Sequence, residues 1–411
     1  MSLRSLADYQ KALLAGVERI EAIEVLIGDA AGAILAEDVT ADAPLPAVAL
    51  AMCDGYAVST ADIKGASEDK PVALAVSFDV SWESREPARH VRKTAARIFS
   101  GAPVPHGADA VVPVGATDAG VAKVSIRTAV SAGANVLAAG ADATKGEVVI
   151  DKGRRLGARQ LGLATRLGRH RLSVHPKPRV VILPVGDELF EPGIAIRGAG
   201  VPESNANALS VMAAEAGANA YRVAAVPDDR ITLRETIEDQ LVRADLMITT
   251  GGLSGARDDT LPEVLSDLGE FEISALALTP GRHHGHGRVS QPGSDTQIPV
   301  IALPGRPSAA IVAFELYVRP VLRTMSGYAQ RERQRFKVPA TRGWTSAAGV
   351  VQCVPVLVTK ARGKVAGAEP VGNPAQPSLS DLSRANGLAV VAEDVTEVKA
   401  GDTLSCIVWD D

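Results

Sequence analysis

The sequence predicts a multi-domain protein built around a doubly wound α/β domain with a mainly parallel sheet, flanked along the chain by smaller, mostly β domains. Three observations lead to this prediction. The chain has 411 residues, which is too long for one ordinary core and suggests about three domains. Residues 176–328 alternate strand-like apolar runs with helical periods, as parallel sheets covered by helices do. The sequence before and after this stretch is punctuated by Gly and Pro and contains short β-like runs.

The first 175 residues are predicted to form two domains. Residues 1–45 and 140–175 form a linker domain of helix and β structure, and residues 46–139 form a small, mostly β domain inserted into it. The chain opens with an amphipathic helix that Ser5 can cap. Its apolar face comprises Leu6, Tyr9, Leu13, Val17 and Ile20. Later β-like runs lie at 71–78, 108–114 and 121–127.

Residues 176–328 contain the predicted α/β domain. Strands are expected at 179–184, 221–226, 245–250, 271–278 and 300–304, and helices at 205–215, 230–241, 261–268 and 307–325. Sheets of this type bind ligands at the carboxyl ends of their strands. Residues 329–411 are expected to form a small β-barrel-like domain, with strands near 336–340, 350–358 and 388–392 and a loose loop at 366–377.

The composition excludes several classes of protein. Hydrophobic residues make up 46% of the chain and charged residues 22%, which is typical of a globular protein. The net charge of −5 comes from well-mixed signs, so we expect no nucleic-acid partner. We find no signal-peptide core and no apolar stretch that could span a bilayer, so we expect a cytoplasmic protein. Cys53, Cys353 and Cys406 lack metal-site spacing and are expected to be packed, unreactive thiols.

A glycine-rich loop ends one predicted strand of the α/β domain. Residues 247–259 read Met-Ile-Thr-Thr-Gly-Gly-Leu-Ser-Gly-Ala-Arg-Asp-Asp. Paired glycines let a ligand approach the backbone closely, and the N–H groups at a helix start favour a phosphate. The carboxylates at the end of the loop could hold a metal ion that accompanies the phosphate. Alone, the loop does not identify a binding site, because many α/β proteins turn through Gly-Gly without a ligand.

Five further segments each have an ordinary structural explanation when taken singly. They are residues 52–58, 97–111, 140–146, 184–189 and 303–308. The Asp-Gly pair at Asp54 is typical of a hairpin turn, and the others could be rigid loops at strand ends.

Together and in this order, the segments resemble the motifs of the molybdopterin molybdenumtransferase family over nearly the whole chain. The family pattern S-A-M-D-G-Y-A is similar to residues 51–57, T-G-A-P-V-P-x-G-A-D-A-V to 100–111, and G-E-D-I to 140–143. S-T-G-D-E-L is similar to 184–189, S-G-G-V-S-x-G-x-x-D to 250–259, and L-P-G-N-P-V-S to 303–309. This family inserts molybdate into molybdopterin in the last step of molybdenum cofactor synthesis.

The resemblance implies an enzyme that releases AMP from adenylylated molybdopterin as molybdate is inserted, with Mg²⁺ as cofactor. The implied catalytic residues are Asp54, Ser100, Asp142, Glu188, Asp228 and Asp259, of which Asp54, Asp142, Glu188 and Asp259 would hold the metal. The implied pterin-binding residues are Gly251, Gly252, Ser254, Arg282, Pro304 and Gly305. The resemblance also implies a molybdopterin-binding α/β domain, an elongated homodimer with its site between subunits, and a molybdopterin-adenylylating protein as a candidate partner.

The chain departs from the family pattern in its cations. The family segment K-x-x-x-K-P-G-K-P-x-x-F-G is similar to residues 275–287, where Ala275, Thr279 and Arg282 replace the three lysines. Up to two positive charges are lost from a site that must bind anions, although Arg306 stands where the family has an asparagine and could restore one. The loss favours an alternative function: a catalytically impaired relative that binds molybdopterin or its nucleotide form as a chaperone or regulator.

The same segment contains three histidines, His283, His284 and His286. They allow three interpretations: a transition-metal site, anion-binding groups that replace the lost lysines, or a solvent-facing loop that has diverged. The last of these is the simplest.

Overall fold

The computed structural model describes residues 3–195, 198–253, 259–361 and 364–409. The chain forms two compact units. Unit 1 comprises Met1–Ala36, Gly153–Gly157 and Arg171–Asp411, and unit 2 comprises Glu37–Lys152 and Ala158–His170. Among the described residues, no helix combines the length and the apolar character needed to cross a membrane.

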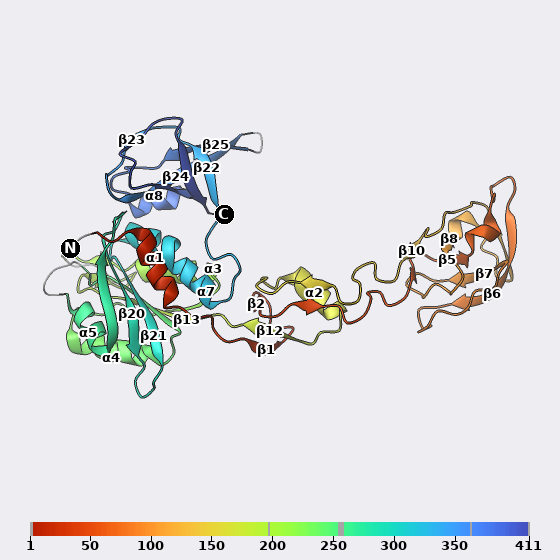
Figure 1. Cartoon of the computed structure of the whole chain (residues 1–411), viewed down its shortest axis with the longest axis horizontal. Helices are drawn as coiled ribbons and strands as arrows, with labels where there is room; N and C mark the ends of the chain where they lie inside the picture. The colour runs from red at the N-terminus through yellow and green to blue at the C-terminus, as the bar shows by residue number, and fades with distance from the viewer. Residues whose placement is uncertain (1–2, 196–197, 254–258, 362–363, 410–411) are drawn as a thin grey trace. The chain divides into compact units, whose positions relative to one another are not determined.

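The main feature of unit 1 is a six-stranded sheet in the order β16-β13-β17-β21-β20-β18 (Figure 1). Its strands are β16 (Asn219–Arg222), β13 (Arg179–Pro184), β17 (Leu246–Thr250), β21 (Gln297–Leu303), β20 (His283–Ser290) and β18 (Gly269–Ala275). The first four run parallel, and β20 pairs antiparallel with both of its neighbours, β21 and β18. The predicted mainly parallel α/β fold is confirmed. Strand β20 was not expected, because its His- and Gly-rich sequence has no β-branched alternation.

Helices cover both faces of this sheet (Figure 1). One face packs against α1 (Leu6–Ala15), α3 (Asn205–Glu215), α6 (Pro307–Ala313) and α7 (Arg319–Met325), and the other against α4 (Arg230–Leu241) and α5 (Thr260–Leu268). In β13, Val180 and Ile182 belong to the first core, and Val181 and Leu183 to the second. Side chains alternate along a strand, so a strand buried on both faces must be apolar throughout. A π-helical turn at Phe314–Val318 joins α6 to α7, which confirms the helical prediction for 307–325.

Helix α1 begins as expected. The Ser5 hydroxyl accepts a hydrogen bond from the backbone N–H of Asp8 at 3.1 Å and so caps the first turn. Tyr9 and Leu13 are buried against the sheet, and the Tyr9 hydroxyl donates to the carbonyl of Gly285 at 3.0 Å. Val17 lies beyond the end of the helix and still packs on the same core.

The C-terminal part of unit 1 is a second sheet, in the order β19-β24-β26-β28-β22, with β25 paired to β24. Its strands are β19 (Leu278–Thr279), β24 (Val351–Ala361), β26 (Gly387–Val391), β28 (Thr403–Val408), β22 (Arg335–Pro339) and β25 (Lys364–Pro370). A short pair, β23 (Trp344–Thr345) with β27 (Glu397–Val398), and α8 (Leu379–Arg384) complete it. The predicted β structure of this region is confirmed, but the loose loop expected at 366–377 is wrong in part, because β25 extends to Pro370.

Unit 1 also holds two small sheets. One is three-stranded, in the order β1-β12-β2, from β1 (Ile23–Leu26), β12 (Arg171–His175) and β2 (Ile34–Leu35). The other pairs β14 (Leu189–Phe190) with β15 (Val201–Pro202).

Unit 2 contains a five-stranded sheet in the order β8-β5-β7-β6-β9. The strands are β8 (Ala110–Pro113), β5 (Gly55–Val58), β7 (Thr94–Ile98), β6 (Val72–Val80) and β9 (Lys123–Ile126). Outside this sheet lie α2 (Ala158–Arg166), 3-10 turns at Thr60–Ile63 and Val114–Ala116, and the strand pairs β10 (Val136–Leu137) with β4 (Leu50–Ala51) and β11 (Val148–Ile150) with β3 (Val39–Thr40). The strands predicted in this region correspond to β6, β8 and β9.

The three cysteines are free thiols, as expected. Burial raises the pKa of Cys353 to about 12 and that of Cys406 to about 11. Burial and the nearby Asp54 carboxylate raise the pKa of Cys53. Each thiol therefore stays protonated near neutral pH. Cys353 and Cys406 are buried, as predicted for packed thiols, whereas Cys53 is half-buried.

Candidate functional site

The carboxyl ends of three parallel strands meet at one edge of the main sheet. The N–H of Val185, after β13, donates to the carbonyl of Thr250 at 2.9 Å. The N–H of Gly251, after β17, donates to the carbonyl of Leu303, the last residue of β21, at 3.2 Å. The loops that follow these strands therefore begin side by side, at the edge where parallel sheets bind ligands.

Glycines allow the loop backbones to approach one another. Gly251 has φ +92°, and a Cβ atom there would lie 2.1 Å from the carbonyl oxygen of Val185. A Cβ on Gly305 would lie 3.2 Å from the Cα of Gly251, so the loops after β17 and β21 are in close backbone contact. Gly252, at φ +63°, follows Gly251 in the loop after β17. We call Gly251, Gly252 and Gly305 the glycine cradle. Ser254, the other loop residue predicted to bind the pterin, lies outside the described residues.

A buried asparagine joins these loops from a third element. The side-chain amide of Asn205, at the start of α3, donates to Thr250 Oγ1 at 2.8 Å and to the carbonyl of Gly305 at 2.7 Å. Thr250 Oγ1 in turn donates to the carbonyl of Pro304 at 3.2 Å. Asn205 is only 9% exposed, and its Oδ1 has no partner among the described residues. Sequence reasoning missed this residue, although a polar side chain at a helix start beside a strand edge could have indicated it.

Four carboxylates gather next to the cradle. The N–H of Asp228 donates to Oδ1 of Asp187 at 3.1 Å, which joins the segment after β16 to the segment after β13. Burial raises the pKa of Asp228, and the negative charges of Asp187, Asp259 and Glu188 raise it further. We call these four residues the acidic cluster. The sequence predicted three of its members and missed Asp187.

Local contacts hold the acidic cluster in place. Thr260 Oγ1, at the start of α5, donates to the carbonyl of Asp228 at 3.0 Å, and Asp259 immediately precedes that helix. A Cβ on Gly186 would lie 2.6 Å from a carboxylate oxygen of Glu188, so the Glu188 side chain folds over this glycine. Oδ1 of Asp228 is buried without a hydrogen-bond partner in the part of the chain that the structure describes. Within that part, no three His, Cys, Asp or Glu side chains are arranged to hold a metal ion by themselves.

The other predicted catalytic residues belong to unit 2. Asp54 and Ser100 lie together, because the N–H of Ser100 donates to Oδ1 of Asp54 at 2.7 Å, and both side chains are exposed. Asp142 is exposed and forms an ion pair of 2.8 Å with Arg166 of α2. The structure therefore groups Glu188, Asp228 and Asp259 in unit 1 and places Asp54, Ser100 and Asp142 in unit 2.

Comparisons with known proteins cover almost the whole chain. Three family models match it in order: the MoeA N-terminal region (domain I and II) at residues 4–168, a probable molybdopterin binding domain at 181–324, and the MoeA C-terminal region (domain IV) at 337–409. Molybdopterin molybdenumtransferase 2 of Mycobacterium tuberculosis is 34% identical to this chain, over 99% of the chain and 100% of the relative. The chain belongs to the molybdopterin molybdenumtransferase family.

Two further relatives agree with this assignment. Molybdopterin molybdenumtransferase of Bacillus subtilis is 28% identical over 93% of this chain and 89% of the relative. A solved structure of a molybdopterin biosynthesis MoeA protein from Pyrococcus horikoshii matches with a TM-score of 0.83 and 26% identity, and the match covers 100% of both chains.

The segment in which this family member lacks lysines lies beside the cradle. A Cβ on Gly281 would be 3.0 Å from Cγ of Pro304, so residues next to Gly281 border the loop after β21. Arg282 and Arg306 are both exposed. Thr279 is half-buried in β19, whereas Ala275, at the end of β18, is only 7% exposed. The two lost lysine positions therefore differ, since position 279 is partly exposed to solvent and position 275 is buried.

The three histidines of this family member lie in strand β20, so their interpretation as a solvent-facing loop is wrong. His284 is fully buried, and its Nδ1 shares a hydrogen bond of 2.6 Å with the Tyr317 hydroxyl. Burial lowers the pKa of His284 to about 4 and also lowers that of His286. Both rings are therefore neutral near pH 7 and do not supply the cations that the lysines would have supplied.

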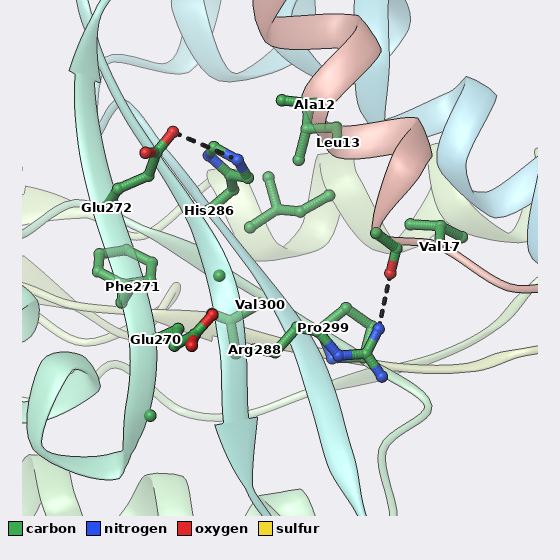
Figure 2. A pocket seen from close by; sticks show the side chains of 14 residues that line it. Ala12, Leu13, Val17, Glu270, Phe271, Glu272, His286, Arg288, Pro299 and Val300 are labelled. Carbon is green, nitrogen blue, oxygen red and sulfur yellow. Dashed lines mark hydrogen bonds and ion pairs between the residues drawn. The ribbon is translucent and has the colours of Figure 1, made fainter.

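His286 borders a separate cavity of about 550 Å³, which lies between α1 and strands β18, β20 and β21 (Figure 2). Its Nε2 lies 3.4 Å from the carboxylate of Glu272, and its ring meets the ring of Tyr9 edge-on at 5.0 Å. Arg288 crosses to α1, where it donates to the carbonyl of Gly16 at 2.6 Å. The residues that line this cavity include none of the glycine cradle or the acidic cluster, so His286 does not serve the candidate site.

Proposed function

We propose that this protein is a molybdopterin molybdenumtransferase that inserts molybdate into adenylylated molybdopterin and releases AMP, with Mg²⁺ as cofactor. One observation carries the proposal: the acidic cluster, with an unpartnered oxygen on Asp228, lies at the same strand edge as a glycine cradle. A backbone cradle binds a phosphate, and clustered carboxylates bind a cation that the phosphates share. Membership of the family supplies the substrate.

The residues have separate roles in this proposal. The backbone at Gly251, Gly252 and Gly305 holds the pterin phosphate, and Asn205 fixes the distance between the two loops. The phosphoanhydride bond between this phosphate and AMP is the bond that breaks. Because the loops are fixed by buried hydrogen bonds, they need little reorganisation when the substrate binds.

The acidic cluster fits Mg²⁺ better than a transition metal. All its donors are carboxylate oxygens, which suit a hard cation. Mg²⁺ keeps several waters and is commonly bound by one or two carboxylates together with substrate phosphates, so a ready-made cage of three side chains is not required. One or two of Asp228, Asp259 and Glu188, together with the substrate phosphates, would hold the ion, which when bound would neutralise phosphate charge.

The proposal extends to partners. A homodimer would let Asp54, Ser100 and Asp142 of one subunit act on substrate held by the other subunit. A molybdopterin-adenylylating protein would supply the substrate. Both expectations come from the resemblance to the family.

The test is to supply purified protein with adenylylated molybdopterin, Mg²⁺ and molybdate, and to measure AMP release and active cofactor. We expect one AMP per cofactor formed. Asp259→Ala should abolish turnover. Asp267→Ala removes an exposed carboxylate from α5 and should retain turnover, because the surface ion pair of Asp267 contributes little to the stability of the protein. Absence of AMP release by the wild-type protein would overturn the proposal.

A second candidate function is supported by one observation. The family's lysine positions hold neutral Ala275 and Thr279, and Ala275 is buried. A protein with fewer cations at its site could bind the pterin without catalysing transfer, as a chaperone or regulator. Tight pterin binding without AMP release in the same assay would support this function.

A further inference from the structure

A second cavity, of about 250 Å³, lies beside α7 and the segment that leads from it into β22. It is lined by Arg319, Arg323, Gln330, Glu332, Arg333, Gln334, Phe336 and Val408. None of these residues belongs to the glycine cradle or the acidic cluster. Three arginines around so small a space are unusual, because guanidinium groups repel one another unless anions separate them.

The arginines share few carboxylates, because Glu332, which also lines the cavity, forms no ion pair with them in the described chain. Arg333 Nε donates to Oε1 of the buried Glu315 at 2.8 Å. Arg319 Nε lies 3.7 Å from that same oxygen, which is close enough for an ion pair but too long for a hydrogen bond. A further carboxylate, that of Glu215, is 3.9 Å from Arg333 and is mostly exposed. One buried carboxylate therefore serves two of the three arginines.

Two guanidinium N–H groups are left without acceptors. Nε of Arg319 and Nε of Arg323 are buried and have no hydrogen-bond partner among the described residues. The Arg319 side chain is only 8% exposed. Arg323 stacks on Tyr328, with 3.9 Å from its guanidinium carbon to the ring centre, and has no carboxylate within 4.0 Å in the described chain. A buried donor without an acceptor is costly and commonly marks the place of a bound water or ion.

The pKa shifts of Arg319 and Arg323 show that positive charge is unfavourable in this cavity. Burial is the main cause that lowers the pKa of Arg319 to about 10; the Glu315 carboxylate opposes this shift, and the charges of Arg333 and Arg323 add to it. Burial also lowers the pKa of Arg323, and Arg333 and Arg155 add repulsion. The residual attraction of Glu315 does not cancel these effects, so a bound anion would stabilise both side chains.

We propose that this cavity binds a tetrahedral oxyanion, either a free phosphate or sulfate or the phosphoryl group of a larger molecule. The planar N–H forks of arginine match the oxygens of such an anion. The cavity volume suits a small ion with a few waters. It is below the range of about 300–1,000 Å³ that is common for sites of larger ligands, so the adenylylated pterin itself does not fit. The site is therefore separate from the proposed transferase site.

The test is calorimetric titration of the full chain with inorganic phosphate at constant ionic strength, with chloride as the reference. Arg323→Met keeps the stacking volume and removes the charge, and we expect it to weaken one phosphate site at least about tenfold. Gln334→Glu, at an exposed lining residue, should weaken the same site without disturbing the fold. Arg331→Met, which removes an exposed arginine outside the lining, is the matched control and should bind as the wild type does.

The outcomes separate the possible sources and the two sites. Tighter binding of AMP than of phosphate, lost in Arg323→Met, would assign a phosphoryl group, and equal or weaker binding would assign the free ion. A phosphate bound in the glycine cradle would persist in Arg323→Met, so failure of the proposed function would leave this result unchanged. The proposal is overturned if the wild type binds phosphate no better than chloride, if Arg323→Met and Gln334→Glu bind as the wild type does, or if Arg331→Met weakens binding equally.

Discussion

The backbone N–H of Asp228 donates to the carboxylate of Asp187 at 3.1 Å, so the segments after β16 and β13 are joined by an acidic residue. The same carboxylate repels that of Asp228 and, with Asp259 and Glu188, adds to the effect of burial in raising its pKa. The contact that positions Asp228 therefore also makes its ionised form less stable. Functional sites commonly contain such conflicts, because a ligand resolves them.

Asp228→Asn should abolish AMP release and stabilise the ligand-free protein at neutral pH. A carboxyl whose pKa is higher in the folded state than its ordinary value of 3.8 makes ionisation destabilising. This loss of folding stability is complete above the folded-state pKa of Asp228 and disappears as pH falls toward 3.8 and below. The stability gained by the variant should therefore be present at pH 7 and vanish near pH 3.8. Urea unfolding of wild type and variant across this range measures it, and an equal gain at both ends would contradict the explanation.

Gly251→Ala should lower stability strongly and remove phosphate binding at the cradle. The new Cβ would lie 2.1 Å from the carbonyl oxygen of Val185, and this backbone atom cannot move without disturbing β13. Gly293→Ala is a matched control, because Gly293 has φ +72° but nothing within 4 Å of the added Cβ. Both variants share a conformational cost of about 1–2 kcal/mol. The denaturant midpoint of Gly251→Ala should fall well below that of Gly293→Ala, and equal midpoints would show that the loop adjusts.

His284→Leu should make stability less dependent on pH between about 6.5 and 4. Folding lowers the pKa of His284 from 6.5 to about 4, so between these pH values the ring is protonated in the unfolded chain but stays neutral in the folded protein. The free energy of unfolding therefore falls as pH drops from 6.5 to about 4. The shift corresponds to about 3 kcal/mol. At neutral pH the variant should be less stable, because the Tyr317 hydroxyl loses its partner. His283→Leu is the control on the same strand, and an unchanged pH slope in His284→Leu would refute the assignment.

Most of the fold could be predicted from the sequence because its elements are strongly patterned. The apolar run at 179–184 and the amphipathic repeat after Ser5 have only one reasonable interpretation, and the structure places β13 and α1 there. Strand β20 could not be predicted in this way. Its histidines and glycines have weak strand propensity, and they are held by ladders to β18 and β21 and by the rings of Tyr9 and Tyr317. These contacts come from residues far away in the sequence.

The candidate site could be predicted only in part. Glu188, Asp228 and Asp259 were identified because they fall in recognisable motifs at strand ends. Asn205 and Asp187 were missed because their importance depends on contacts across the chain: Asn205 reaches Thr250 and Gly305, and Asp187 reaches the N–H of Asp228. A spacing pattern cannot show such contacts, since they exist only once the strand ends lie side by side.

Thr279→Lys should strengthen the binding of phosphate or of the pterin substrate at the glycine cradle, whereas Ala275→Lys should destabilise the protein. Position 279 is half-buried in β19, and the neighbouring Gly281 packs against Pro304 of the cradle loop. One added charge near an anion contributes about 1 kcal/mol in a solvated site, which corresponds to about fivefold tighter binding. The gain should shrink at high salt, because ions screen an exposed charge.

Ala275 is buried, so an ammonium group there would have to leave water without an evident partner. Titrations at two salt concentrations, with thermal unfolding of both variants, measure these effects. If Thr279→Lys binds no more tightly than the wild type, the loss of that lysine does not explain any deficit in the site. If it binds more tightly and AMP release rises with it, the missing cation limits the rate of the transferase. The protein would then be a slower transferase rather than a chaperone or regulator.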